Sequence, residues 1–165
     1  VDSVSKRFNI CGARIGCVAS KNKKVMENIL KFAQGRLSSP TLEQLAIIPL
    51  LKKHRRYTDP MVKEYKRRRD AAVSVLKTIP GVEFFKPEGA FYLIAKLPIE
   101  NAEYFCRWLL EEFNDRKETI MFAPAEGFYE TEGAGKKEIR IAFVLGVKKL
   151  TRAMEILKIA LEEYK

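Results

Sequence analysis

The sequence has few of the residues that build disulfide frameworks, zinc sites or membrane spans. It contains three cysteines and one histidine, His54, among 165 residues. An odd, sparse set of cysteines does not indicate a disulfide framework, and a lone histidine supports neither a cysteine–histidine zinc site nor a serine triad. No apolar run reaches the roughly 18 residues that a transmembrane helix needs. We therefore expect no metal site and no membrane span.

The N-terminus also lacks the basic-then-apolar pattern of a secretory signal, and the chain begins with Val1 rather than methionine. We take the cytoplasm as the expected compartment. Because a specific motif, described below, begins at once, we expect the sequence to start partway through a longer protein.

The composition is that of a globular protein, with 47% hydrophobic and 32% charged residues, and it carries a net charge of +10. Much of the excess charge lies in residues 52–69, where nine lysines and arginines accompany only Asp59 and Glu64. A basic block is compatible with nucleic-acid binding. However, the run from Lys66 to Asp70 interrupts an amphipathic helical pattern, and no known binding motif accompanies it. We therefore favour a solvated helix face and expect no nucleic acid.

The hydrophobic periodicity predicts the element order β-α-α-α-β-β-α-β-β-α, an α/β fold with a small α+β domain. Gly35 and a break at 57–59 are expected to end helices, Ser39 to cap one, and Pro49 to kink or shorten it. The expected elements are a strand at 13–20, helices at 21–34, 40–53 and 59–78, strands at 82–85 and 90–95, a helix capped by Asn101, strands at 120–123 and 138–144, and a terminal helix over 150–164.

The first sixteen residues carry the most specific pattern. Lys6 follows two small hydroxyl residues, and Arg14 lies between two glycines. The apolar stretch Ile15–Ala19 is typical of a buried strand, which would place Lys6 at the mouth of that strand. A lysine so placed can form a Schiff base with a carbonyl cofactor. Ser3 and Arg14 can hold an anion, the arginine through its planar fork.

This segment resembles the cofactor-lysine motif of the class I/II aminotransferases, pyridoxal-phosphate (PLP) enzymes of fold type I. The resemblance implies that Lys6 is the catalytic Schiff-base lysine and that Ser3 and Arg14 bind the cofactor phosphate. It covers essentially the whole chain but matches only the C-terminal part of the family. It implies a remnant of the large PLP-binding domain in residues 1–56 and a small domain in residues 57–165. The matching positions are Ser3, Val4, Ser5, Lys6, Asn9, Ile10, Gly12, Arg14, Ile15 and Gly16.

Arg140 is the second candidate arginine. It lies between Ile139 and Ile141, and an arginine within an apolar strand is costly unless an anion accompanies it. The sequence Ile-Arg-Ile-Ala-Phe resembles the family's C-terminal segment, in which the arginine binds the substrate α-carboxylate through two parallel hydrogen bonds. A structural salt bridge on a sheet face is the alternative.

Three further residues are candidates for substrate contacts. Phe91 and Tyr92 belong to a Gly-Ala-Phe-Tyr segment that resembles one near the family's substrate pocket, although a hairpin in the core would explain both. Arg36 precedes a helix that, in the family, crosses the dimer interface toward the partner's active site. An ordinary capped helix start is the alternative for that segment.

The resemblance implies a PLP-dependent aminotransferase that exchanges amino groups between an amino acid and a 2-keto acid by a ping-pong mechanism, as a homodimer in the complete enzyme. The family's groups that hold the cofactor ring come earlier in its chain, so we expect these residues to be inactive alone. Two alternatives remain. One is another fold type I PLP enzyme, such as a C–S lyase or decarboxylase. The other is a non-catalytic basic module that binds nucleic acid or a partner chain.

Overall fold

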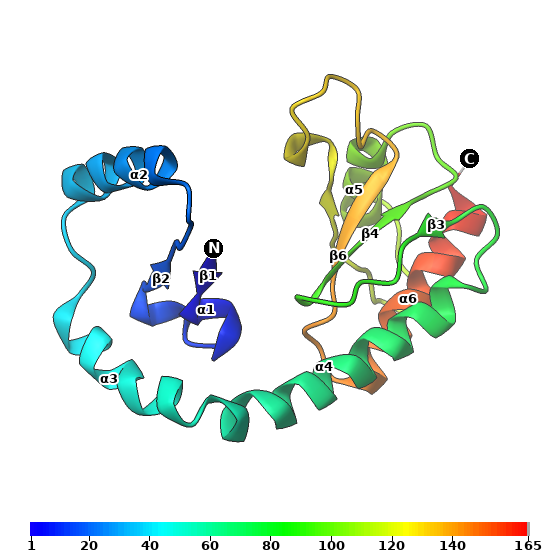
Figure 1. The fold of residues 1–165 in the computed structure, drawn as a ribbon. Helices are drawn as coiled ribbons and strands as arrows, with labels where there is room; N and C mark the ends of the chain where they lie inside the picture. The colour runs from blue at the N-terminus through cyan, green and yellow to red at the C-terminus, as the bar shows by residue number, and fades with distance from the viewer. Residues whose placement is uncertain (165) are drawn as a thin grey trace. The chain divides into compact units, whose positions relative to one another are not determined.

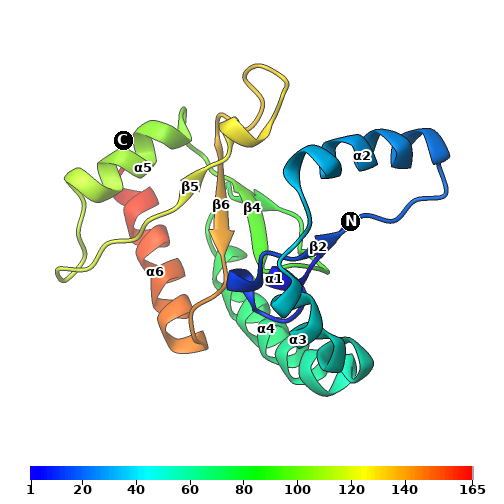
Figure 2. The ribbon, with the colours of Figure 1, turned by 90° about the vertical axis from the view of Figure 1, so that its left-hand side faces the viewer.

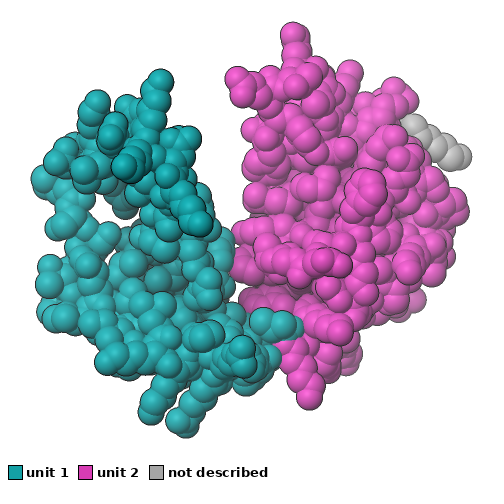
Figure 3. Space-filling view, viewed as in Figure 1, with its two compact units in different colours: residues 1–62 teal, residues 63–165 magenta. Residues whose placement is uncertain are grey.

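The computed structural model describes residues 1–164, which form two compact units (Figures 1 and 3). The first unit comprises Val1–Val62 and the second begins at Lys63. Helix α4 (His54–Leu76) contributes residues to both. The boundary expected from the sequence, at 56/57, falls in the same helix. No helix in the described part of the chain is long and apolar enough to cross a membrane.

The first unit has a small core. Val4, Ala13 and Ile47 are buried, with Phe8, Ile15 and Leu50 packed against them. These residues come from the two ends of the lysine motif and from one helix. The elements of the unit are β1 (Asp2–Ser3), α1 (Val4–Arg7), the 3-10 helix η1 (Cys11–Ala13), β2 (Gly16–Cys17), α2 (Lys23–Arg36), α3 (Thr41–Lys52) and the start of α4.

The expectation of a buried strand at 13–20 was wrong. Only Gly16–Cys17 forms a strand, which pairs antiparallel with β1, and residues 16–20 are exposed. A continuous apolar strand is buried when other strands flank it and helices cover its faces. Within residues 1–164, only the two-residue β1 pairs with this segment.

Helix α2 shows the same lack of cover. It begins after Asn22, whose side-chain oxygen accepts a hydrogen bond from the Val25 N–H at 3.2 Å, and it continues past Gly35, which was expected to end it. Its apolar spacing predicted one buried face, but none of its residues is buried. Leu30 is 58% exposed and Phe32 82%. No other element in the described chain buries this face.

The boundaries of α3 and α4 also differ from expectation. Pro40, and not Ser39, occupies the N-cap position of α3, and Pro49 does not end that helix. Helix α3 ends at Lys52, with Lys53 as its C-cap. Helix α4 then continues through residues 57–59, where the sequence predicted an end to the helix. Pro60 lies inside α4. A proline removes one backbone hydrogen bond from a helix. Helix α4 tolerates this loss and remains helical on both sides of Pro60.

The second unit contains a four-stranded antiparallel sheet with the order β3-β4-β6-β5. Figure 2 shows α5 and α6 on one side of strands β4 and β6. The expected succession of strands and helices is confirmed, although the strands are shorter than predicted. The elements are β3 (Glu83–Phe84), β4 (Tyr92–Lys96), α5 (Ala102–Glu111), β5 (Ala123–Pro124), the 3-10 helix η2 (Glu126–Phe128), β6 (Glu138–Ala142) and α6 (Val147–Glu163).

One face of this sheet forms the main core. In β4 and β6 every second residue is buried, and these residues pack with apolar side chains of α4, α5 and α6. Asn101 caps α5 as expected, because its Oδ1 accepts hydrogen bonds from the N–H groups of Glu103 and Tyr104 at 2.8 and 3.2 Å. Leu110 of the same helix is 53% exposed. The largest fully buried side chains are Phe105, Phe143, Leu76, Leu93, Leu97, Leu109, Ile139, Ile141, Leu150, Met154 and Leu157.

We expect Phe105→Ala to destabilise the second unit by about 3–5 kcal/mol, because it removes a ring with no exposed surface and leaves a cavity. Urea unfolding, followed by the fluorescence of Trp108 in the same helix, measures the change. Phe85→Ala is the matched control, since the Phe85 ring is 94% exposed and its loss should change the unfolding free energy little. Equal effects of the two substitutions would contradict this description of the core.

Candidate active-site residues

The first candidate site is the segment Ser3–Gly16, called the cofactor loop below. Its two ends are joined by the β1–β2 pair, in which Ser3 lies opposite Gly16. The Val4 N–H also donates a hydrogen bond to the Ile15 carbonyl oxygen at 3.1 Å. This closure brings Ser3, at the start of the motif, close to Arg14 near its end.

Apolar packing against helix α3 fixes the cofactor loop. Val4 and Ala13 are both buried against Ile47 of α3. Arg7 of α1 donates a hydrogen bond from Nε to Asp2 Oδ2 at 2.7 Å, and this bond lowers the pKa of the Asp2 carboxyl. The short helix α1 is thereby held at both ends, and Lys6 lies on its exposed side.

Arg14 has an unusual backbone conformation. Its φ of 52° and ψ of 36° lie in the left-handed region, which glycine adopts without cost and most other residues avoid. Its Nη1 donates a hydrogen bond to the Cys11 carbonyl oxygen at 3.0 Å. Backbone strain of this kind concentrates at functional sites, so its presence under an exposed arginine supports a role for that side chain.

The chemistry of the cofactor loop suits PLP. Ser3 supplies a hydroxyl and Arg14 a guanidinium, which together match the hydrogen-bonding needs of a phosphate. Lys6 supplies a primary amine, the group that can bind a carbonyl cofactor covalently. The three groups belong to one loop closed by β1 and β2, so the donor set fits this cofactor.

Gly16 is required by the closure of the loop. A Cβ added at this residue would lie 2.9 Å from the carbonyl oxygen of Asp2, a backbone atom that cannot move aside as a side chain can. The space around Gly12 is open, with no atom within 4 Å of an added Cβ. The two glycines that flank Arg14 therefore have different structural roles.

The second candidate site lies on the sheet of the second unit. Ile139 and Ile141 are buried, whereas Arg140 between them is on the opposite, partly exposed face. Arg140 therefore avoids the cost that we expected for an arginine within an apolar strand, because successive side chains of β6 point to opposite faces. Within residues 1–164 the Arg140 guanidinium has no ion pair, so the structural salt bridge considered as an alternative is not found there.

Aromatic rings accompany Arg140 on this face. Its Cζ lies 4.7 Å from the ring centroid of Tyr92 and 4.4 Å from that of Phe128. Phe91, beside Tyr92 in the sequence, stacks on Tyr65 at 5.5 Å and packs at the edge of the core. Tyr92 is therefore beside Arg140, while Phe91 also contributes to the core.

Phe128 was not identified from the sequence. It lies in the glycine-containing loop before β6, and it ends the short 3-10 helix η2. The only sequence signal is an aromatic pair, Phe128 and Tyr129, within a segment otherwise rich in glycine and charge. Such a pair does not reveal which cation it will meet in the folded chain.

Arg36 is the last residue of α2 and is exposed. Its side chain has no hydrogen bond or ion pair with the residues that the structure describes. The structure therefore does not bring Arg36 together with the cofactor loop or with Arg140, and its assignment to substrate binding stays a prediction.

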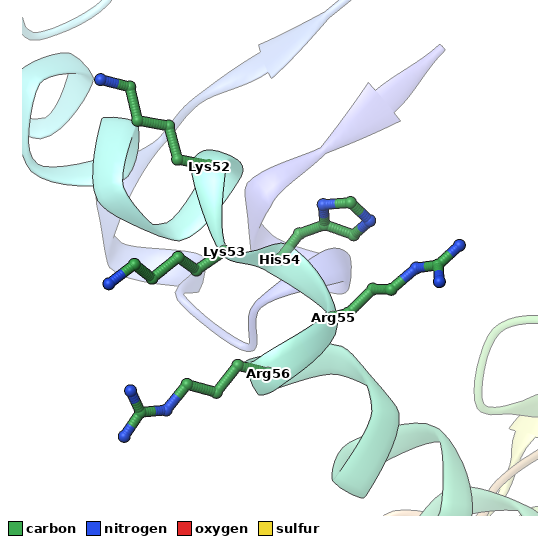
Figure 4. A pocket seen from close by; sticks show the side chains of 5 residues that line it. All are labelled: Lys52, Lys53, His54, Arg55 and Arg56. Carbon is green, nitrogen blue, oxygen red and sulfur yellow. The ribbon is translucent and has the colours of Figure 1, made fainter.

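A shallow concavity occurs where α3 meets α4. It is lined by five consecutive basic residues, Lys52, Lys53, His54, Arg55 and Arg56 (Figure 4). The picture shows these side chains pointing in different directions rather than toward a common point. This arrangement does not form a site for a small ligand.

Comparison with known proteins assigns the fold. The family model described as "Aminotransferase class I and II" matches residues 1–157. The chain belongs to this family. It is 31% identical over 98% of its length to an aspartate aminotransferase of Pyrococcus horikoshii. It is 30% identical over 96% of its length to a (5-formylfuran-3-yl)methyl phosphate transaminase of Methanocaldococcus jannaschii.

A solved structure gives the same result. The alanine aminotransferase of Pyrococcus furiosus matches 97% of this chain with a TM-score of 0.77 and 30% identity. The chain spans 40% of the length of each of these two curated relatives and 41% of this solved chain. The mixed helix and sheet structure is therefore part of the aminotransferase fold.

We expect Gly16→Ala to weaken PLP binding by about tenfold or more, because the added Cβ forces apart the β1–β2 pair that closes the cofactor loop. A titration of PLP absorbance against the complete enzyme measures the affinity. Gly12→Ala is the matched control, since its Cβ meets open space. If both variants bind PLP as the unchanged protein does, the closure of this loop does not determine cofactor affinity.

Proposed function

We propose that these residues work within a PLP-dependent aminotransferase that exchanges amino groups between an amino acid and a 2-keto acid. The observation that carries this proposal is that Ser3, Lys6 and Arg14 belong to one loop closed by the β1–β2 pair, with Arg14 in a strained backbone conformation. Membership of the aminotransferase family supports it. The named relatives act on different compounds, so the amino-acid substrate does not follow from them.

The groups of the cofactor loop have separate roles in this proposal. Arg14 and the Ser3 hydroxyl donate hydrogen bonds to the cofactor phosphate and fix its position. Lys6 Nζ holds the cofactor covalently and, once released as a free amine, takes a proton from the substrate α-carbon and returns one as general base and acid. PLP, when bound, supplies an electron sink for that proton transfer.

Arg140 binds the α-carboxylate of the substrate. Its guanidinium is partly exposed and has no hydrogen bond or ion pair within residues 1–164. The planar fork matches a carboxylate through two parallel hydrogen bonds, which fix orientation as well as position. Tyr92, whose ring lies beside this guanidinium, forms part of the same surface. Phe91 and Arg36 remain candidates for substrate contacts.

The exposed apolar side chains of the first unit support a larger assembly. Contiguous exposed apolar surface marks an interaction site on a soluble domain. We propose that residues 1–56 belong to a large PLP-binding domain and residues 57–165 to a small domain, in a homodimer that is active where these residues alone are not. The exposed large apolar residues of α2 and α3 are Val25, Leu30, Phe32, Leu42, Leu45, Ile48 and Leu51.

The cysteines are compatible with a reducing compartment. Cys11 and Cys17 are exposed thiols, and burial raises the pKa of Cys106 to about 11. None of the three forms a disulfide within residues 1–164. We propose the cytoplasm as the location, since free thiols persist there.

Lys6→Ala should abolish amino-group exchange in the complete enzyme while leaving its fold intact. The reason is that no other group of the cofactor loop can both bind a carbonyl and move a proton. Turnover is followed with a panel of amino acids and 2-keto acids, which also separates exchange from decarboxylation or C–S cleavage. Lys31→Ala, an exposed lysine of α2, is the control. Multiple turnovers by Lys6→Ala at a near-normal rate would remove the basis of the proposal.

Arg140→Lys should weaken amino-acid binding by about tenfold or more and leave PLP affinity nearly unchanged, because lysine keeps the charge but loses the fork. Arg14→Lys should do the reverse. Spectroscopic titrations of PLP and of substrate in both variants measure the two affinities. A loss of PLP affinity in Arg140→Lys, without a loss of substrate affinity, would show that the two arginines have been assigned the wrong way round.

A further inference from the structure

The ring of Phe128, a loop residue, contacts the guanidinium of Arg140. The ring centroid is 4.4 Å from Arg140 Cζ, closer than the 4.7 Å of Tyr92. At such distances a guanidinium is attracted to the face of an aromatic ring. The ring contacts the cation but offers it no strong hydrogen-bond acceptor. The guanidinium N–H groups of Arg140, which have no hydrogen-bond partner within residues 1–164, therefore stay available to a ligand.

The loop that carries Phe128 is fastened to the strand that carries Arg140. The Tyr129 hydroxyl donates a hydrogen bond to Glu138 Oε2 at 2.6 Å. The same bond raises the pKa of the Tyr129 hydroxyl above its ordinary value. The Ala125 N–H also donates to the Glu138 carbonyl oxygen at 2.9 Å. Glu138 begins β6, two positions before Arg140.

Two further contacts set the position of Phe128 within that loop. The Phe128 N–H donates to the Ala125 carbonyl oxygen at 2.9 Å, which forms the turn of η2. Gly135 has a φ of +76°, and a Cβ at this residue would lie 2.6 Å from the Tyr129 ring. The close approach of Gly135 to Tyr129 therefore requires glycine. The backbone that leads to Phe128 is fixed on both sides.

We propose that Phe128 is a positioning residue for Arg140, and that the loop Ala125–Glu138 sets the affinity for the substrate carboxylate through this ring. The inference rests on the proposed function of Arg140. An arginine side chain has several rotatable bonds, and its two-point contact with a carboxylate needs one orientation of the guanidinium plane. A ring held against the cation removes alternative orientations before the carboxylate arrives. The same effect applies to the amino acid and to the 2-keto acid, because both carry this carboxylate.

The first test replaces the ring. In the complete enzyme, Phe128→Leu should raise KM about tenfold for both the amino acid and the 2-keto acid, with a smaller change in kcat and no change in PLP affinity. Phe128→Tyr keeps the ring and should bind both substrates nearly as the unchanged enzyme does. Phe85→Leu removes an exposed ring of the same unit and is the control. If Phe128→Leu fails to fold, Phe128→Met takes its place.

The second test asks whether Phe128 acts through Arg140. The dissociation constant of 2-oxoglutarate is measured by calorimetry in Phe128→Leu, Arg140→Lys and the double variant. We expect Phe128→Leu to weaken binding about tenfold in the Arg140 background and less than twofold in the Arg140→Lys background. A merely structural role would weaken binding equally in both backgrounds, and that result would overturn the inference.

The outcomes separate this inference from the proposed function. Amino-group exchange by the unchanged enzyme, together with normal carboxylate binding by Phe128→Leu, would overturn the role of Phe128 and leave the function standing. An unchanged enzyme that holds PLP on Lys6 but exchanges no amino group would overturn the proposed function itself, and the inference with it.

Discussion

The second unit depends on the register between β4 and β6. In this register Ile94 lies opposite Arg140, and Leu93 lies opposite Ile141. Because side chains alternate between the faces of a strand, a shift of one residue would move the isoleucines to the open face and Arg140 into the core. The cost of burying an unpaired guanidinium makes that shift unfavourable. The same pairing therefore builds the core and presents the candidate carboxylate-binding group.

In the first unit, burial of apolar residues also positions exposed charged residues, but the core is much smaller. Its core of Val4, Ala13 and Ile47 is small, yet two of these residues lie in the cofactor loop. Burial of Val4 and Ala13 fixes the backbone on either side of Lys6 and next to Arg14, while the charged side chains stay exposed. The tight contact at Gly16 then joins the ends. Local closure, rather than a large core, therefore holds the backbone of this loop.

Features that depend on local contacts could be predicted from the sequence. The side-chain cap at Asn101 depends on neighbouring residues, and the lysine motif, which is specific in its spacing, indicated the family. Features that depend on distant partners could not be predicted. The stretch Ile15–Ala19 has the composition of a buried strand, but no sheet surrounds it in the described chain. Helix α4 passes through the expected break near Tyr57, because a single proline did not outweigh the continuing helical pattern. Phe128 lies in a loop and Arg140 in a strand, so the hydrophobic periodicity of the sequence could not predict the contact between them.

The hydrogen bond between Tyr129 and Glu138 divides the loop before β6 into two parts that differ in how well they tolerate substitutions, insertions and deletions. Next to the bond, Gly135 lies against the Tyr129 ring, and the Phe128 N–H is bonded to the Ala125 carbonyl oxygen. Beyond it, residues 130–133 form an exposed tip. Exposed loop tips are the segments where insertions and deletions are tolerated. The tip can therefore vary in length and composition among related chains without displacing the ring beside Arg140, so that divergence at the surface and constancy at the candidate carboxylate-binding group can coexist in one short segment.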